Sequence, residues 1–187
     1  MKTFSEISKK KEPKPADMVY DGDYIKVKSM DGWEFVEERD IVIIVPHLLE
    51  FDEVLLRKEY VPPFNTREPE QEHFLTCISG TMEAGEKPTD TLIREVKEEA
   101  GVVLNTGFEG WKKWGKFFMN KGNNSYCHIY YLPITTSDFQ KIEPTGDGSE
   151  EEAKSNTVRI DLKYLDSLNP SDLITMTVIK FLKEELA

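Results

Sequence analysis

The chain has 187 residues, of which 39% are hydrophobic, and this length can bury one substantial core with room for a small appendage. Its formal net charge of −11 at pH 7 and its lack of basic clusters argue against extended nucleic acid as a partner. No apolar run approaches the roughly 20 residues that cross a bilayer, and no secretory apolar segment follows Met1, so we expect no membrane association and a cytoplasmic location.

The first part of the chain predicts a β-hairpin ahead of the main domain. Residues 19–38 contain two strand-like runs on either side of Met30-Asp-Gly-Trp, a sequence typical of a tight turn. A lone hairpin is marginally stable, so we expect this one to pack on the main domain or on a second subunit. We therefore divide the chain into an amino-terminal region, residues 1–38, and a main domain, residues 39–187.

The main domain has the pattern of an α/β protein. Apolar runs predict strands over residues 40–46, 53–57, 74–78, 112–118, 126–132 and 157–162. A final helix is expected over 171–186, with Ser171 as its N-cap. Cys77 and Cys127 have strand-like surroundings and no metal-ligand spacing, so we expect both to be reduced core residues.

The most informative feature is a run of fixed spacing between Gly80 and Val102. It has the form G-x5-E-x7-R-E-V-x-E-E-x-G-V, which ordinary residue frequencies would produce with a probability on the order of 10⁻⁷ or less per starting point. Pro88 suits a first helical turn and Gly101 a helix end, so the run predicts a helix of roughly 88–100.

Three acidic residues on this predicted helix indicate a metal site. Glu95, Glu98 and Glu99 are related as i, i+3 and i+4, so their carboxylates share one helix face. Hard carboxylate oxygens favour Mg²⁺ or Mn²⁺. The glycines of the preceding loop let the backbone carbonyl of Ser79 or Gly80 turn inward as a neutral ligand. The alternative is an amphipathic helix whose acidic face is merely solvated.

Arg94 stands next to these carboxylates in the sequence. Its guanidinium can hold Glu86 or a neighbouring carboxylate in position through charge-assisted hydrogen bonds.

An acidic protein does not attract a polyanionic substrate without local cations, so a metal ion would serve substrate binding as well as catalysis.

The segment from 80 to 102 resembles the Nudix box of hydrolases that cleave nucleoside diphosphates linked to another moiety, and it is complete at every defining position. The resemblance implies an α/β/α sandwich with a mixed sheet. It also implies that Glu95, Glu98 and Glu99 bind Mg²⁺ or Mn²⁺ together with the Ser79 carbonyl. We count Glu98 and Arg94 as catalytic residues.

Outside the box, the order of elements is similar to the ADP-ribose and nucleotide-sugar pyrophosphatase branch, in which a hairpin domain and a strand ending in Leu-Leu-Arg-Lys-Glu-Tyr precede the box. This similarity implies a homodimer formed through the hairpin. It also implies that Arg57 contacts a phosphate or ribose, unless it is an ordinary surface residue, and we group Glu86 with it as substrate-binding. The chain departs from the branch at residues 76–79 and 120–122, and both departures concern specificity.

An acidic, glycine-rich loop covers residues 143–152. In related ADP-sugar enzymes a glutamate from the corresponding loop acts as general base, which implies Glu150, Glu151 or Glu152 here, and we choose Glu150 and Glu152. The alternative is a solvated loop without a role.

These residues together predict a Nudix hydrolase that splits ADP-ribose or an ADP-sugar into AMP and a sugar phosphate. One alternative is a Nudix hydrolase of nucleoside triphosphates, dinucleoside polyphosphates or capped RNA. Another is a Nudix-like sensor that binds such a ligand without turning it over. The intact box argues against a sensor, because a protein that only binds could lose Glu98 or Glu99 and keep its fold.

Overall fold

The computed structural model describes residues 15–22, 25–146, 148, 152–168, 170 and 172–187. The chain divides into two compact units. The smaller one contains the described residues up to Glu38 together with Met119–Asn124, and the larger one contains Arg39–Phe118 and Ser125–Ala187.

The smaller unit is built on a three-stranded antiparallel sheet in the order β1-β2-β3, with β1 Asp17–Asp21, β2 Lys26–Met30 and β3 Trp33–Glu37. The expected hairpin is present as β2 and β3. Its turn residues Asp31 and Gly32 both have positive φ, 53° and 79°, which matches the twist of the flanking strands. Strand β1 is a third strand that the sequence pattern did not reveal. The Val36 amide donates to the Gly122 carbonyl at 2.8 Å, so the loop after β9 belongs to this unit.

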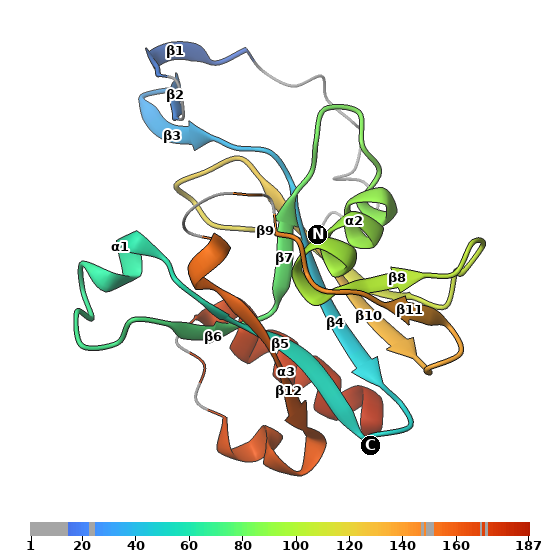
Figure 1. Cartoon of the computed structure of the whole chain (residues 1–187). Coiled ribbons are helices and arrows are strands. Elements are labelled where there is room, and N and C mark those ends of the chain that lie inside the picture. Colours follow the sequence, from blue (N-terminus) through green and yellow to red (C-terminus); the bar gives the residue numbers. More distant parts are fainter. Residues whose placement is uncertain (1–14, 23–24, 147, 149–151, 169, 171) are drawn as a thin grey trace, which may run out of the picture. The chain divides into compact units, whose positions relative to one another are not determined.

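The larger unit is organised around a seven-stranded mixed sheet (Figure 1). Its central path runs β12-β5-β4-β10-β9, while β6 pairs with β5 and β7 pairs with β4. Strands β4 and β10 are parallel and the other pairs are antiparallel. The strands are β4 Ile41–Leu48, β5 Glu53–Glu59, β6 Phe74–Thr76, β7 Ile78–Thr81, β9 Lys112–Phe118, β10 Tyr126–Ile134 and β12 Asn156–Asp161, and β8 Val102–Leu104 pairs separately with β11 Phe139–Lys141.

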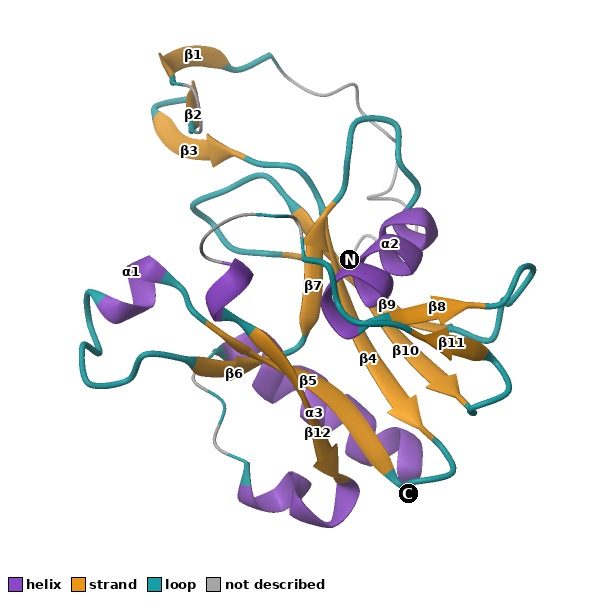
Figure 2. Cartoon of the chain, in the orientation of Figure 1, coloured by secondary structure: helices purple, strands orange, loops and turns teal. Residues whose placement is uncertain are grey.

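Two long helices, α2 Pro88–Ala100 and α3 Leu173–Leu186, cover opposite faces of this sheet (Figure 2). Tyr130 of β10 lies in the buried cluster that holds the apolar face of α2. The next residue, Tyr131, stacks on Trp114 with ring centroids 5.2 Å apart, and Trp114 contacts Phe181 of α3. Successive strand residues point to opposite faces, so the unit is an α/β/α sandwich, as predicted.

The shorter helical elements are α1 Pro62–Asn65, η2 Glu152–Lys154 and η3 Leu162–Ser167. None of the helices in the described part of the chain combines the length and the hydrophobicity that a bilayer crossing requires.

Two local predictions were wrong. The single strand expected over 74–78 is two strands, because the chain changes partner from β5 to β4 at Cys77, whose amide donates to Thr175 Oγ1 at 3.2 Å. The N-cap of the last helix is Asp172, whose carboxylate accepts from the Thr175 amide at 2.7 Å. Ser171, the predicted cap, lies outside the described residues.

The two cysteines are buried and free, as predicted. Burial raises the pKa of the Cys77 thiol to about 12, so this side chain stays protonated and behaves as a small apolar group.

Candidate active site

Helix α2 has the bounds that the sequence predicted, and local features at each end explain them. Pro88 occupies the first turn, and the Asp90 carboxylate accepts a hydrogen bond from the Lys87 amide at 3.3 Å. At the other end Gly101 adopts φ of 62°, a left-handed conformation that stops the helix. These two features set the length of the helix that carries the acidic residues.

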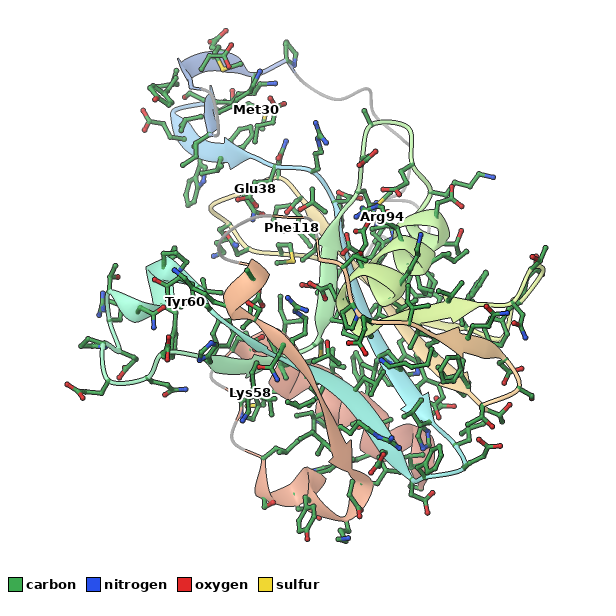
Figure 3. All side chains as sticks on the ribbon, viewed as in Figure 1. Met30, Glu38, Lys58, Tyr60, Arg94 and Phe118 are labelled. Carbon is green, nitrogen blue, oxygen red and sulfur yellow. The ribbon has the colours of Figure 1, made fainter. Side chains whose placement is uncertain are left out.

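Arg94 on α2, labelled in Figure 3, contacts several carboxylates. Its Nη1 donates to Glu95 Oε1 at 2.5 Å and to Glu98 Oε2 at 3.2 Å, and its Nε lies 3.3 Å from Glu86 Oε1. Nη2 donates to the Thr81 carbonyl at 3.0 Å, which ties the helix to β7. The side chain therefore fixes three acidic residues of the box at once.

Glu86 supports Arg94 from the loop before the helix. Its carboxylate also accepts from the Glu83 amide at 2.8 Å and from the Thr91 hydroxyl at 2.7 Å. Burial favours the neutral acid, but these hydrogen bonds and the charge of Arg94 outweigh it and lower the pKa of Glu86 to about 2. Glu86 was expected to touch substrate, and in the structure its partners are Arg94 and the loop.

Glu95 lies directly against the backbone of Gly80. A β-carbon on Gly80 would be 1.7 Å from Glu95 Oε1, so only glycine leaves room for this carboxylate at the strand. The absence of a side chain at Gly80 therefore leaves the space that the Glu95 carboxylate occupies.

Glu99 has a separate set of partners, which lie on β5, β7 and β12. Its Oε1 lies 3.2 Å from Arg57 Nε, and its Oε2 accepts from the Ser79 amide at 3.3 Å. Its backbone carbonyl accepts from Thr157 Oγ1 at 2.7 Å. Arg57 is only 3% exposed, so the reading of this residue as an ordinary surface arginine is wrong.

Two cavities meet at Glu98 and Glu99, which line both. One cavity, of about 460 Å³, is also lined by Ile41, Glu59, Ser79, Gly80, Thr81, Glu83, Arg94 and Glu95. The other, of about 420 Å³, is lined by Arg57, Ser155, Asn156, Thr157, Ala153 and residues 144–146 and 148. All the expected metal-site residues thus line a single cavity, and a second polar cavity adjoins it.

The acidic loop reaches the same helix through its backbone. The Thr145 and Gly146 amides both donate to the Glu98 carbonyl at 3.1 Å. Glu150, a candidate general base, lies outside the described residues. Glu152, the other candidate, begins the short helix η2, and its side chain also lies outside the described part.

The residues of the larger cavity have the donor chemistry that Mg²⁺ and Mn²⁺ prefer. Three carboxylates and the backbone of β7 supply hard oxygen atoms. Within the described residues, no three acidic, histidine or cysteine side chains already converge as a ligand set, and Arg94 and Arg57 pair with the box carboxylates. The donor set therefore has the chemistry to hold a divalent ion.

Sequence reasoning missed several residues around the site. Thr91 and Thr157 hold Glu86 and Glu99, and Glu59 and Glu83 line the larger cavity. Glu59 had a possible signal, because it belongs to the Leu-Leu-Arg-Lys-Glu-Tyr segment that resembles the pyrophosphatase branch. Thr157 had none, since only the sheet brings β12 next to β5 and α2.

A layered α/β/α fold with a carboxylate-rich helix facing a glycine on a strand defines the class of this protein. Residues 38–167 match the NUDIX domain family, and the chain therefore belongs to that family. The prediction of a Nudix pyrophosphatase enzyme is confirmed at this level, and enzymes of this family generally use divalent metal ions.

One solved structure that the chain resembles carries the description "Crystal structure of ADP compounds hydrolase". The two share 22% sequence identity with a TM-score of 0.66, over 92% of this chain and 91% of that chain. At this identity the likeness shows a common fold. No curated protein matches the chain.

Proposed function

We propose that this protein hydrolyses the pyrophosphate bond of a nucleoside diphosphate linked to another moiety, with ADP-ribose or an ADP-sugar as substrate. Water adds to one phosphorus, the bond from that phosphorus to the bridging oxygen breaks, and AMP and a sugar phosphate leave. The observation that carries the proposal is the complete box whose Glu95, Glu98 and Glu99 line one cavity. The description of the similar solved structure as an ADP compounds hydrolase supports the choice of substrate.

Mg²⁺ or Mn²⁺ would be held by Glu95, Glu98, Glu99 and the Ser79 carbonyl. The Ser79 amide donates to Glu99, and in an antiparallel strand the amide and carbonyl of one residue point to the same side, so this carbonyl also faces α2. A bound divalent ion would neutralise phosphate charge and make water more nucleophilic.

The protein's own side chains supply orientation and proton transfer. Arg94 holds Glu95 and Glu98 at fixed positions on the helix face. Glu150 or Glu152, from the loop whose backbone is tied to the Glu98 carbonyl, would remove the proton of the attacking water. The second cavity, whose lining includes the polar side chains of Ser155, Asn156 and Thr157, would receive the polar group beyond the pyrophosphate.

A homodimer formed through the sheet β1-β2-β3 is part of the same proposal. Large apolar side chains on these strands, among them Met18, Tyr20 and Trp33, are exposed in the single chain. Exposed apolar patches favour association with a partner. Light scattering coupled to size exclusion should give the mass of a dimer, and Trp33→Lys together with Tyr20→Lys should give a monomer.

The activity test is an incubation with Mg²⁺ and a panel of ADP-ribose, ADP-glucose, NADH, diadenosine polyphosphates and nucleoside triphosphates, followed by chromatography of the products. Release of AMP from ADP-ribose or ADP-glucose alone is the expected result. Turnover confined to nucleoside triphosphates or diadenosine polyphosphates would establish the alternative specificity. Tight binding of one compound without turnover would establish a sensor.

A further inference from the structure

We propose that Arg57 is a positioning residue that holds the Glu99 carboxylate in the orientation in which it binds the divalent ion. The inference rests on the proposed metal-dependent function and gives Arg57 a role different from the substrate contact that the sequence suggested. It starts from the partners of Glu99, which come from three strands outside its own helix.

Both oxygens of the Glu99 carboxylate are held. Arg57 Nε lies 3.2 Å from Oε1, and the Ser79 amide donates to Oε2 at 3.3 Å. The ion pair with Arg57 of β5 and the hydrogen bond from Ser79 of β7 together place the carboxylate relative to the sheet. Glu99 is therefore oriented by the protein before any ligand arrives.

The backbone of Glu99 is held as well. Its carbonyl accepts from Thr157 Oγ1 at 2.7 Å and lies 3.5 Å from Arg57 Nη1. A planar guanidinium can reach a carboxylate and a carbonyl at once, whereas an ammonium group acts as a single point charge. The geometry thus uses the feature that distinguishes arginine from lysine.

Burial separates Arg57 from a typical substrate-binding arginine. The side chains of Arg57 and Glu99 are 4% and 9% exposed. A guanidinium this covered has little surface to offer a phosphate, and its charge is already compensated by Glu99. An ionised carboxylate has about four lone-pair sites on its two oxygens, so pairing with Arg57 and Ser79 leaves Glu99 able to bind a cation.

The two arginines divide the box carboxylates between them. Arg94, which is 28% exposed, contacts Glu95 and Glu98, while Arg57 contacts Glu99 from the buried side. Replacing a residue that orients a metal ligand in this way typically lowers metal affinity or activity by about 10–100-fold. Arg57 therefore belongs to the metal site through Glu99.

The decisive variant is Arg57→Lys, because it keeps the positive charge and removes the planar fork. Mn²⁺ binding to the substrate-free protein, measured by electron paramagnetic resonance of the free ion, should weaken by about 10-fold or more. The matched control is Arg159→Lys on β12, whose arginine pairs with Glu53 at the surface and should leave the Mn²⁺ affinity unchanged. Unchanged Mn²⁺ affinity in Arg57→Lys, with a raised KM for ADP-ribose, would overturn the proposal in favour of substrate contact.

A second variant keeps the test valid if Arg57→Lys does not fold. The pair Arg57→Met with Glu99→Gln removes both charges, which a buried site tolerates better than losing one. The double variant and Glu99→Gln alone should bind α,β-methylene ADP-ribose with equal affinity, because Arg57 acts through Glu99. Weaker binding by the double variant would overturn the role. Absence of Mn²⁺ binding by the unmodified protein would instead refute the proposed metal site itself.

Discussion

The backbone of Gly101 lies so close to that of Ile142 that a β-carbon on the glycine would be 2.1 Å from the Ile142 carbonyl oxygen. The Ile142 amide donates to the Gly101 carbonyl at 2.9 Å. The end of the box helix and the start of the acidic loop are thus joined through main-chain atoms. The last glycine of the box serves packing as well as helix termination.

We expect Gly101→Ala to be clearly more destabilising than Gly85→Ala. Both glycines have positive φ, 62° and 83°, so both variants carry the cost of about 1–2 kcal/mol for a left-handed alanine. Only at Gly101 does the new methyl group also meet backbone atoms, because nothing lies within 4 Å of a β-carbon at Gly85. Urea unfolding of the two variants measures the difference, and equal losses would show that the chain relaxes around the added methyl group.

Gly80→Ala should separate activity from stability. The added methyl group takes the place of the Glu95 carboxylate, and that flexible side chain can swing away at small cost to the fold. We expect a near-normal melting temperature with a marked loss of Mn²⁺ binding and turnover. Full activity would mean that the position of Glu95 against β7 does not matter.

Glu98→Gln should reduce kcat by orders of magnitude while leaving the melting temperature unchanged or higher. Glu98 is close to two other carboxylates on one helix face, so the relief of repulsion offsets the loss of its ion pair with Arg94 in the metal-free protein. Glu184→Gln on α3, an exposed position, is the control. Turnover equal to that of the control would remove Glu98 from the metal site.

The acidic loop is tested by replacing its glutamates one at a time. Either Glu150→Gln or Glu152→Gln should lower kcat strongly with little change in KM, because a general base acts in the chemical step. Glu143→Gln, at the exposed start of the loop, should retain activity. If Glu150→Gln and Glu152→Gln both turn over substrate normally, neither residue is the catalytic base.

The low pKa of Glu86 predicts how stability depends on pH. Its folded-state pKa of about 2 lies below the ordinary 4.5, so its contribution is complete above about pH 4.5 and is lost as the pH falls toward 2. Glu86→Gln should therefore be less stable than the unmodified protein near neutral pH, and the gap should narrow below pH 4.5. Urea midpoints across this range measure the gap, and a constant difference would contradict the assigned pKa.

The box helix was predictable because its signals are local. Pro88 and Gly101 mark its ends, and the spacing of Glu95, Glu98 and Glu99 places three carboxylates on one face whatever the rest of the chain does. The same holds for the hairpin turn, because Asp31 and Gly32 form an Asp-Gly pair, which favours a turn with positive φ at both residues.

Other features depended on partners far away in the chain. The break at Cys77 exists because β5 and β4 diverge there, and β1 exists because β2 offers it an edge. The short sequence runs that form these strands reveal neither the divergence of β5 and β4 nor the free edge of β2, because a strand's hydrogen bonds are made with another segment.

The chain's own residues determined the reaction class, because carboxylate spacing on a helix is set by 3.6 residues per turn. Tertiary structure alone decided which side chain supports each carboxylate. Arg57 is separated from Glu99 by 42 positions, and only the packing of β5 beside α2 and β7 buries the two together. Burial and pairing are properties of the assembled layers, so they arise when the sheet and the helix meet.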